Sequence, residues 1–414
     1  MENWIMPEKV YLTGRGLVTP LGNGLSVNET ALRTGKSGIT RIPEFEENHL
    51  ISLVGGMPDE APETALIDRK KARFCPPTAL MSVYAVEEAL REAQIPLEEA
   101  RTRRIAVIGG VAGSNYREVF SQTYNFYESK RLRCVTPYSV PRIMPSSAVS
   151  NLSLIFGFTG ETYDISAACA SSALAVMVAA RLIRSGQYDI VIAGGAEQLD
   201  WVQALGFNAI RALSCKYNDT PELSSRPFDR DRDGFVLAGG AAYMVLESER
   251  SVLARGVRPI SELSGVYSNS NAIDMVVPDA ASCADVMRGA VADAGLKPED
   301  ITYINTHGTA TPVGDPVEMA AIRDVFGSHA AINSTKSQTG HMVGATGAAE
   351  IIFTSMMLEK DFLSRSINLD NPEPEFGWAD LIREYREGIR VNHALSNSFA
   401  FGGSNISVIV SRCE

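Results

Sequence analysis

Strand-like and helical segments alternate along almost the whole chain, and this alternation restricts the fold classes open to it. Short apolar runs predict eight strands, at 9–12, 104–109, 163–166, 190–194, 241–247, 301–305, 394–398 and 406–410. Apolar residues at helical spacing predict helices between many of them, for example at 77–94, 170–185, 282–294 and 347–358. This order predicts an α/β fold in which helices cover both faces of mostly parallel sheets.

Composition and net charge limit the classes of function that this chain can have. The chain has 414 residues, of which 45% are hydrophobic, so it can form two domains or one large duplicated domain. Its formal net charge of -11 argues against a nucleic-acid partner, because phosphate binding needs clustered basic charge. No apolar stretch approaches the length of a membrane span. The first six residues lack a basic start followed by an apolar block, so we expect no signal peptide and a cytoplasmic protein.

The cysteines do not suggest a structural framework. Six are scattered along the chain without any C-x-x-C pair: Cys75, Cys134, Cys169, Cys215, Cys283 and Cys413. This spacing argues against a set of disulfides and against a zinc site. We therefore expect no bound metal.

One cysteine lies among very small residues where a strand pattern changes to a helical one. The segment is Asp164-Ile-Ser-Ala-Ala-Cys169-Ala-Ser-Ser-Ala. At such a turn, free backbone N–H groups and the positive end of a helix dipole lie near the sulfur and favour its thiolate. The small neighbours leave room for a carbonyl substrate. The alternative is a structural role, because a free cysteine also packs as a small apolar residue.

Two of the five histidines lie on loops rich in Gly, Ser and Thr. His307 follows an apolar strand in Asn305-Thr-His307-Gly-Thr, and His341 ends Lys336-Ser-Gln-Thr-Gly-His341 before a helix of small residues. A lone histidine is more often a core or surface residue than a catalyst. A nucleophilic cysteine together with two imidazoles, however, is suited to acyl transfer through a thioester.

Four motifs, in order and suitably spaced, carry a resemblance to a known family. They are Ala168-Cys169-Ala-Ser-Ser, Asn305-Thr-His307-Gly-Thr, Lys336-Ser-Gln-Thr-Gly-His341 and Asn397-Ser-Phe-Ala-Phe-Gly-Gly-Ser-Asn405. The chain resembles a β-ketoacyl-[acyl-carrier-protein] synthase, a condensing enzyme of the thiolase superfamily and of its Cys-His-His type. The resemblance implies the thiolase fold, with duplicated βα halves in five αβαβα layers. We expect residues 1–255 to carry the cysteine and residues 256–414 to carry both histidines.

The resemblance also implies a mechanism. Cys169 takes an acyl group from a thioester, and a malonyl-type extender then loses CO₂ and attacks that group. His307 and His341 donate N–H hydrogen bonds to the enolate oxygen, and the backbone N–H groups of Cys169 and Phe401 hold the oxyanion. Phe401 also matches a gating position. The enzyme itself binds no cofactor, because the phosphopantetheine belongs to an acyl carrier protein, and two threonines match positions that hold this arm: Thr309 and Thr311.

Four charged residues near these motifs have supporting interpretations. The resemblance gives Lys336 an electrostatic role beside His341, often with Glu350 as its partner. Lys336 is therefore grouped with the catalytic residues. Asp315-Pro-Val-Glu318 has the pattern of a capping box, with Asp at the N-cap, Pro at N1 and Glu at N3, so a structural role is favoured for both acids.

A basic cluster on this acidic chain is a candidate docking surface. Asp68 precedes Arg69, Lys70, Lys71 and Arg73, and the segment is expected to open a helix that runs to Arg91. A carrier protein of this pathway is strongly acidic, so the cluster could steer its docking. The alternative is a solvated helix face. The resemblance adds a second contact at Arg211.

The remaining alternatives concern the pathway and the subunit type. Leu237-Ala-Gly-Gly-Ala241 stands where the family usually has an acidic turn, which favours a specialised polyketide, polyene or unusual fatty-acid synthase over a housekeeping one. A thiolase needs a second catalytic cysteine on a glycine-rich loop, and Cys413 has no such loop. The main rival is a non-catalytic chain-length-factor-like subunit, but such subunits have lost the cysteine that this chain keeps. We expect a homodimer or a heterodimer with such a subunit.

Overall fold

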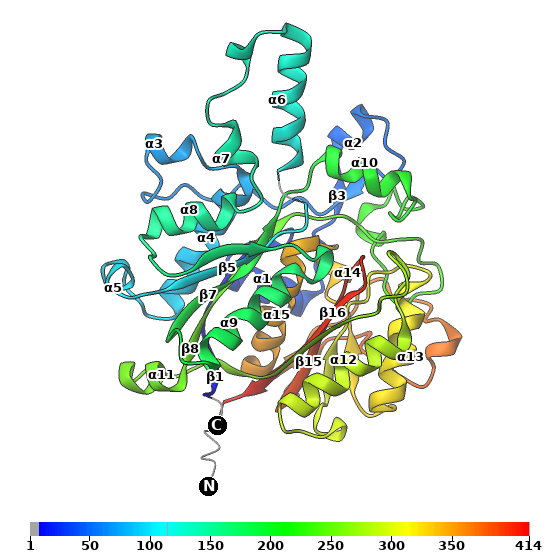
Figure 1. Cartoon of the computed structure of the whole chain (residues 1–414). Coiled ribbons are helices and arrows are strands. Elements are labelled where there is room, and N and C mark those ends of the chain that lie inside the picture. The colour runs from blue at the N-terminus through cyan, green and yellow to red at the C-terminus, as the bar shows by residue number, and fades with distance from the viewer. Residues whose placement is uncertain (1–7, 114, 414) are drawn as a thin grey trace.

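The computed structural model describes residues 8–113 and 115–413, and one large mixed sheet runs through this part of the chain (Figure 1). The six N-terminal residues used above for the signal-peptide argument lie outside it. The order across the twelve-stranded sheet is β13-β11-β10-β15-β16-β9-β1-β8-β7-β5-β6, with β2 paired to β1. Two small two-stranded sheets, β12–β14 and β3–β4, lie apart from it.

The strands have the following bounds: β1 Val10–Thr19, β2 Gly22–Asn23, β3 Thr40–Arg41, β4 Val54–Gly55, β5 Ala106–Gly110, β6 Thr162–Ile165, β7 Ile190–Glu197, β8 Gly240–Ser248, β9 Ser261–Ser270, β10 Tyr303–Asn305, β11 Ala331–Asn333, β12 Phe362–Leu363, β13 Asp380–Leu381, β14 Arg386–Glu387, β15 His393–Phe399 and β16 Ser404–Arg412. The α-helices are α1 Leu25–Thr34, α2 Pro43–Glu47, α3 Arg69–Ala72, α4 Pro77–Glu92, α5 Leu97–Thr102, α6 Tyr116–Ser129, α7 Ser139–Ile143, α8 Ser147–Phe156, α9 Ser171–Arg184, α10 Trp201–Ala209, α11 Glu249–Arg255, α12 Ala280–Asp293, α13 Gly314–Phe326, α14 Lys336–Thr339 and α15 Thr346–Lys360. Short 3₁₀ turns are η1 Leu132–Cys134, η2 Ala168–Ala170, η3 Pro221–Leu223, η4 Pro298–Asp300, η5 Val343–Ala345 and η6 Pro374–Phe376.

The sheet consists of two halves with the same topology. When the five main strands of each half are numbered in chain order, both halves follow the order 3-2-4-5-1: β6-β5-β7-β8-β1 in one and β11-β10-β15-β16-β9 in the other. The two first strands, β1 and β9, pair over only two residue pairs, Tyr11↔Glu262 and Leu12↔Ser261. This repeat confirms the duplicated fold that the resemblance implied.

The expectation of mostly parallel sheets is wrong, because each half is mixed. Pairings within β6-β5-β7 and β11-β10-β15 are parallel, whereas β8 and β16 run antiparallel to both of their neighbours. In the second half the chain reverses direction over a short connection, because the turn 400–403 alone joins β15 to β16. Antiparallel strands can be joined by such a tight turn, while a parallel pair needs a long crossover.

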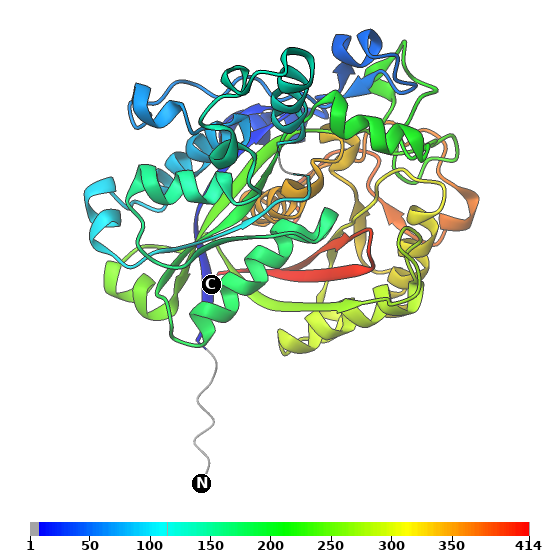
Figure 2. The ribbon, with the colours of Figure 1, turned by 45° about the horizontal axis from the view of Figure 1, so that its top comes forward.

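Five layers are stacked in the order helix, sheet, helix, sheet, helix (Figures 1 and 2). Helices α9 and α15 form the central layer, where their apolar residues pack on β5, β7 and β8 on one side and on β15 and β16 on the other. Helices α4 and α8 cover the outer face of the first half-sheet, and α12 and α13 that of the second. The central layer is therefore covered on both sides, which explains why every residue of α15 from Thr346 to Leu358 is buried.

All eight predicted strands are present, but two of the ten main strands were missed, as were the two-residue strands β2 and β13 of the same sheet. The first is β9, Ser261–Ser270, which contains four serines and an asparagine and pairs with β16. The second is β11, which has only three residues, Ala331–Asn333. Neither carries an apolar run long enough to reveal it. Among the helices of residues 8–113 and 115–413, none combines the length and apolar character needed to cross a membrane.

Candidate active site

Cys169 lies on a tight turn between a strand and the central helix. β6 ends at Ile165, the turn η2 contains Cys169, and α9 starts at Ser171. The hydroxyl of Ser171 accepts a hydrogen bond from the N–H of Ala167 at 2.8 Å and donates one to the carbonyl of Ala168 at 2.7 Å. Ala168 has a φ of 46°, a left-handed conformation that only a small side chain tolerates well. The small residues of the motif thus allow the turn that presents the sulfur.

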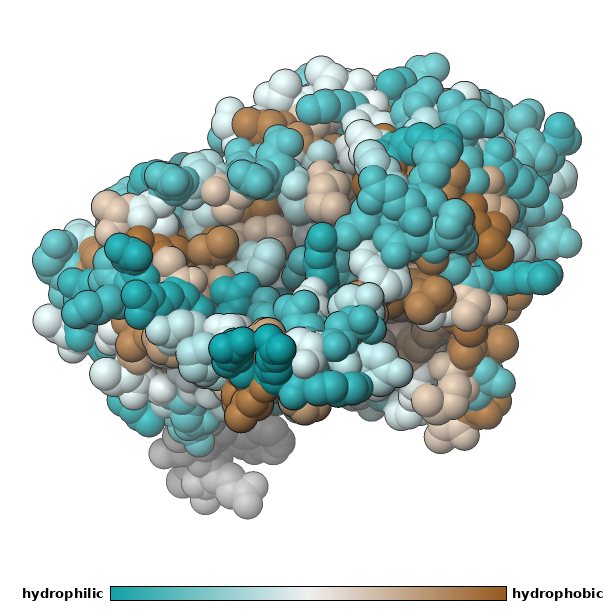
Figure 3. Space-filling view, turned by 90° about the horizontal axis from the view of Figure 1, so that it is seen from above, coloured by the Kyte–Doolittle hydropathy of each residue, from teal (hydrophilic) through white to brown (hydrophobic). Residues whose placement is uncertain are grey.

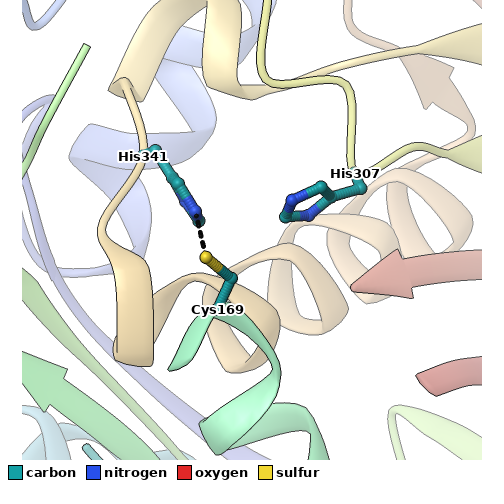
Figure 4. A group of neighbouring side chains, drawn as sticks. All are labelled: Cys169, His307 and His341. Carbon is teal, nitrogen blue, oxygen red and sulfur yellow. Dashed lines mark hydrogen bonds between the residues drawn. The ribbon is translucent and has the colours of Figure 1, made fainter. Parts of the chain in front are cut away.

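His341 hydrogen-bonds the sulfur directly. Its Nε2 lies 2.9 Å from Cys169 Sγ, and its Nδ1 lies 3.0 Å from the hydroxyl of Thr346 at the start of α15 (Figure 4). A hydroxyl can donate or accept, so Nδ1 has a partner in either tautomer of the neutral ring. The backbone of His341 is fixed as well, because its N–H donates to Val236 O at 2.7 Å and its carbonyl accepts from Ala238 N–H at 2.9 Å. The unusual segment 237–241 therefore helps to hold this histidine.

His307 approaches the sulfur from the other half of the molecule. It follows β10, and its ring is 5.4 Å from that of His341 between centroids, at an interplanar angle of 86°. One ligand atom of each of Cys169, His307 and His341 lies within 4.8 Å of the others. Figure 4 shows both rings directed toward the space beside the sulfur. The structure thus brings together the three residues that the motifs singled out.

Both imidazoles are neutral at neutral pH. Burial lowers the pKa of His307 and of His341 well below the ordinary value, and the nearby Lys336 charge lowers both further. A neutral imidazole carries one N–H. His307 Nδ1 is buried without a hydrogen-bond partner in the described part of the chain. Each ring can therefore donate a hydrogen bond to an oxygen beside the sulfur without carrying a charge that would trap an enolate.

The N–H groups at the turn favour the thiolate as expected, but burial of the sulfur opposes them. Burial raises the pKa of Cys169 to about 12, and this effect outweighs the Lys336 charge and the backbone hydrogen bonds that lower it. Two of those hydrogen bonds come from the N–H groups of Phe401 and of Cys169 itself. The resting nucleophile is a thiol that points at His341, and the two N–H groups expected to form the oxyanion hole converge on it.

Lys336 and Glu350 form a buried ion pair behind His341. Lys336 Nζ lies 2.7 and 2.8 Å from the two carboxylate oxygens, and both side chains are 1% exposed. The hydroxyl of Thr335 also donates to Glu350, at 3.2 Å. Burial raises the pKa of Glu350, against the lowering effect of Lys336. Lys336 acts on the site through its charge, which lowers the pKa of Cys169 and of both histidines, and it is best described as a positioning residue.

Replacing Lys336 by methionine is expected to destabilise the fold by about 3–5 kcal/mol, because the Glu350 carboxylate is then buried without its partner. Urea unfolding followed by circular dichroism measures this change. The control is Arg288→Met, which breaks an exposed pair with Asp324 and should cost less than about 1 kcal/mol. Equal effects of the two variants would contradict the prediction.

The capping-box interpretation of Asp315 and Glu318 is wrong. Helix α13 starts at Gly314, its N-cap residue is Val313, and neither acid caps it; the Thr311 hydroxyl accepts from the Gly314 N–H at 3.0 Å instead. Glu318 instead accepts hydrogen bonds from the N–H groups of His307 and Gly308, at 2.8 and 2.7 Å. Asp315 accepts from the N–H of Ala310 at 3.0 Å and of Phe228 at 2.9 Å. Both carboxylates are buried and hold the loop that carries His307, so they are structural in a way the spacing did not show.

Two cavities meet at the sulfur. One, of about 280 Å³, is lined by both histidines and by Thr309, Thr311 and Arg211. The other, of about 510 Å³, is lined by residues of the 112–113 loop, α6 and α10, among them Tyr116 and Gln203. Cys169, Phe207, Val343 and Phe401 line both. Phe401 therefore stands between the two spaces, as its expected gating position requires.

The basic cluster and Arg211 lie at different places. The expected helix from Asp68 to Arg91 is broken, because α3 is a single turn capped by Asp68 and α4 begins only at Pro77. Arg69, Lys70 and Arg73 are exposed, and Arg73 also donates to the hydroxyl of Tyr138 at 2.9 Å. Arg211 follows α10 and lies at the mouth of the first cavity. Figure 1 shows α3 and α10 on opposite sides of α6 and α7.

In residues 8–113 and 115–413, one group of three or more His, Cys, Asp or Glu has ligand atoms this close together: Cys169, His307 and His341. Zn²⁺ accepts such a cysteine and histidine set. A zinc ion would, however, occupy the sulfur that an acyl group needs. That the protein uses no metal stays a prediction, which an assay with and without a chelator tests.

Two contributors to the site were missed in the sequence. Thr346 follows His341 by five residues and gives no signal of its own. Glu197 is a carboxylate directly after the buried strand residues Ala193-Gly-Gly-Ala, and an acid in such a place is a recognisable anomaly. Glu197 is fully buried and hydrogen-bonds three segments around the cavities.

Comparisons with known proteins cover nearly the whole chain. The family described as beta-ketoacyl synthase, N-terminal domain, matches residues 7–251, and the corresponding C-terminal domain matches residues 260–370. The 3-oxoacyl-[acyl-carrier-protein] synthase 1 of Haemophilus influenzae is 38% identical over 98% of this chain and 99% of its own. That of Escherichia coli is 37% identical over 98% of this chain and 100% of its own.

Solved structures show the same fold. A beta-ketoacyl synthase from Burkholderia phymatum matches with a TM-score of 0.94 and 34% identity, over 98% of this chain and 100% of that one. A ketosynthase solved in complex with a type II PKS acyl-carrier protein and bound to the hexaketide matches with a TM-score of 0.89 and 26% identity, over 99% and 100% of the two chains.

Proposed function

The chain belongs to the beta-ketoacyl synthase family, and from this premise we propose that Cys169, His307 and His341 carry out its condensation. As a β-ketoacyl-[acyl-carrier-protein] synthase it is an acyltransferase. The single observation that carries the residue assignment is the cluster itself. A thiol and two neutral imidazoles, within 4.8 Å of one another, lie where two cavities meet.

In the first half-reaction, Cys169 Sγ attacks the carbonyl carbon of an acyl thioester, and its proton passes to His341 Nε2, 2.9 Å away. The N–H groups of Cys169 and Phe401 stabilise the oxyanion. The bond from the carbonyl carbon to the donor sulfur then breaks, and His341 returns the proton to that sulfur. Because the thiol proton has a defined acceptor, the reaction does not require a preformed thiolate.

In the second half-reaction, the malonyl carboxylate leaves as CO₂, and the electron pair of the broken C–C bond forms an enolate. The N–H of His307 donates to the enolate oxygen, and His341 donates to it from Nε2 in the neutral tautomer whose Nδ1 accepts from the Thr346 hydroxyl. Its carbon attacks the acyl carbonyl, a C–C bond forms, and the bond to Cys169 Sγ breaks. The released thiolate regains a proton from solvent through His341. Lys336 favours the neutral form of both rings, so that neither donates a full proton to the enolate.

The extender arrives on the phosphopantetheine arm of an acyl carrier protein. Thr309 and Thr311 line the cavity that contains both histidines, and their hydroxyl groups lie 3.3 Å apart on its wall. Arg211 lies at its mouth beside an exposed apolar loop that contains Val276 and Val277. A basic side chain next to apolar residues suits an acidic carrier. The α3 cluster is a second candidate contact.

A second copy of the chain is the proposed partner. In the described residues β6 forms one end of the main sheet and pairs on one side only. Helix α6 rises from the body in Figure 1, has no buried residue and exposes apolar side chains, among them Phe120, Tyr124 and Tyr127. Figure 3 shows separate hydrophobic patches on this upper face. An unpaired edge and an apolar helix both favour a covering subunit. Sedimentation of the purified chain distinguishes a homodimer from a monomer that needs a chain-length-factor-like subunit.

The pathway is fatty-acid biosynthesis by likeness to the 3-oxoacyl-[acyl-carrier-protein] synthases. The specialised alternative remains of interest because the 237–241 segment lacks the usual acidic turn and because polyketide ketosynthases share the fold at 26% identity.

One experiment tests both the activity and the pathway. The purified chain is mixed with malonyl carrier protein and saturated acyl carrier proteins of several lengths, and the products are weighed by mass spectrometry. We expect a mass increment on the Cys169 peptide and elongation by two carbons. Elongation of ordinary saturated chains by the chain alone would exclude the specialised pathway. Absence of any acylation with all donors would exclude the enzyme and favour the non-catalytic subunit.

A further inference from the structure

Glu197 is a buried carboxylate that the condensation mechanism does not use. It ends β7 and is 0% exposed. Its Oε2 accepts from Ala112 N–H at 3.0 Å and from Gly344 N–H at 3.1 Å, and its Oε1 accepts from Gly113 N–H at 3.0 Å and from Gln203 Nε2 at 3.0 Å. These four donors come from three separate segments of the chain. One side chain thus joins the loop after β5, helix α10 and the turn η5.

The three segments are the walls around the nucleophile. Ala112, Gly113 and Gln203 line the second cavity, the one away from the histidines. Gly344 lies between His341 and Thr346, whose side chains form the hydrogen-bonded chain to the sulfur. It also follows Val343, which lines both cavities and has a φ of 41°. Glu197 therefore connects the wall of the second cavity to the turn that sets the position of His341.

The packing leaves this connection little freedom. A Cβ added at Gly344 would lie 2.7 Å from Glu197 Oε2 and 2.5 Å from Ala112 N. A Cβ added at Gly113 would lie 2.7 Å from Glu197 Oε1 and 2.5 Å from Gln203 Nε2. Two glycines are thus required for the backbone to approach the carboxylate closely. A change of the side chain at position 197 should therefore shift the backbone of η5, because the close packing at Gly344 leaves no room for the side chain to move alone.

Glu197 also acts on the nucleophile through its charge. It raises the pKa of Cys169, whereas Lys336 lowers it. Burial raises the pKa of Glu197 itself to about 7, against the four hydrogen bonds that lower it. The titratable groups that this carboxylate influences are Cys169 from η2 and Tyr116 from α6. Its charge is therefore present above neutral pH and lost below it.

We propose that Glu197 is a positioning residue of the condensing site. Its carboxylate holds the turn after His341 against the wall of the second cavity, and its negative charge, held next to the cavity that Cys169 lines, opposes ionisation of the thiol. The expected effect on condensation kinetics rests on the proposed function. The reactivity of the Cys169 thiol toward an alkylating reagent, however, can be measured without any substrate.

The test compares alkylation of Cys169 by iodoacetamide in the wild type and in Glu197→Gln from pH 5.5 to 9.5. Only the thiolate reacts, so the rate reports its fraction. The ratio of the variant rate to the wild-type rate is expected to be close to 1 below pH 6, where Glu197 is protonated in the wild type. Above pH 8 it is expected to rise to about tenfold, because the variant lacks the opposing charge.

The matched control is Glu88→Gln. Glu88 is also a partly buried carboxylate that accepts hydrogen bonds from two backbone N–H groups, those of Leu17 and Leu25, but it lies at α4 away from the site. A merely structural role predicts that both variants lose stability and leave the alkylation ratio flat across pH. A flat ratio for Glu197→Gln, indistinguishable from that of Glu88→Gln, overturns the proposal.

A second variant keeps the proposal testable if the glutamine variant does not fold. Glu197→Asp retains the charge but is too short to reach all four donors. Its alkylation curve should follow the wild type, while its kcat for condensation falls about tenfold or more with a smaller change in KM. A wild-type kcat for this variant overturns the positioning role. If the wild type itself does not condense, the proposed function fails, whereas the alkylation curves still test Glu197.

Discussion

Replacement of Cys169 by alanine is expected to abolish condensation, with a loss of at least about 10⁴-fold in kcat/KM. No other sulfur in the described residues lies within hydrogen-bonding reach of His341, so nothing can take over the acyl group. The two histidines stay in place, because their backbones are held by Val236 and Glu318 rather than by the cysteine. Release of CO₂ from a malonyl carrier protein should therefore persist after condensation has stopped.

The measurement follows acylated protein, elongated product and CO₂ in the same reaction. Cys134→Ala is the control, because this cysteine is exposed and lies on η1, away from both cavities. It should retain full activity. Condensation by the Cys169 variant at more than about a hundredth of the wild-type rate would contradict the assignment of the nucleophile.

Replacement of His307 by alanine is expected to lower kcat for condensation by about 10²–10³-fold while acylation of Cys169 proceeds. The two half-reactions separate because, of the two histidines, His341 alone hydrogen-bonds the sulfur in the described residues, whereas His307 faces the site from the loop after β10. The second cavity and the oxyanion N–H groups do not contain His307, so the acyl-enzyme should accumulate. Loss of one enolate donor slows only the later step.

Mass spectrometry of the Cys169 peptide and of the product separates the two half-reactions. His341→Ala should slow both of them, because it removes the acceptor of the thiol proton as well as an enolate donor. His329→Gln is a control on the surface, where the imidazole contacts only the carbonyls of Pro298 and Ile301. If His307→Ala blocked acylation as strongly as His341→Ala, the division of roles would be wrong.

The reacting residues could be predicted because short local patterns carry them. Cys169 lies among alanines and serines that permit a left-handed residue before it, and His307 and His341 each lie next to a glycine. The electrostatic state of the cysteine could not be predicted in the same way. The turn and the helix end favour a thiolate, but burial depends on what the rest of the chain places around the sulfur, and it raises the pKa to about 12.

The carboxylates show the same division between local and distant information. Asp315 and Glu318 have the spacing of a capping box, yet α13 begins two residues too early for it, at Gly314. Glu318 instead accepts hydrogen bonds from the N–H groups of the His307 loop. A buried N–H without a partner costs more free energy than a helix end that can be hydrated by solvent. No pattern within the segment itself reveals these donors.

The amino-acid sequence by itself determined the alternating elements, the turn that presents Cys169 and the two histidine loops, because these depend on propensities and contacts within a few residues. Only the tertiary structure decided how far apart the sulfur and the rings lie, which carboxylate holds which loop, and that Glu197 links three segments. Two of the contacts involved, His341 with Cys169 and Gly344 with Glu197, join residues 172 and 147 positions apart. They are set by how the two half-sheets and the central helices pack, and local sequence does not encode that packing.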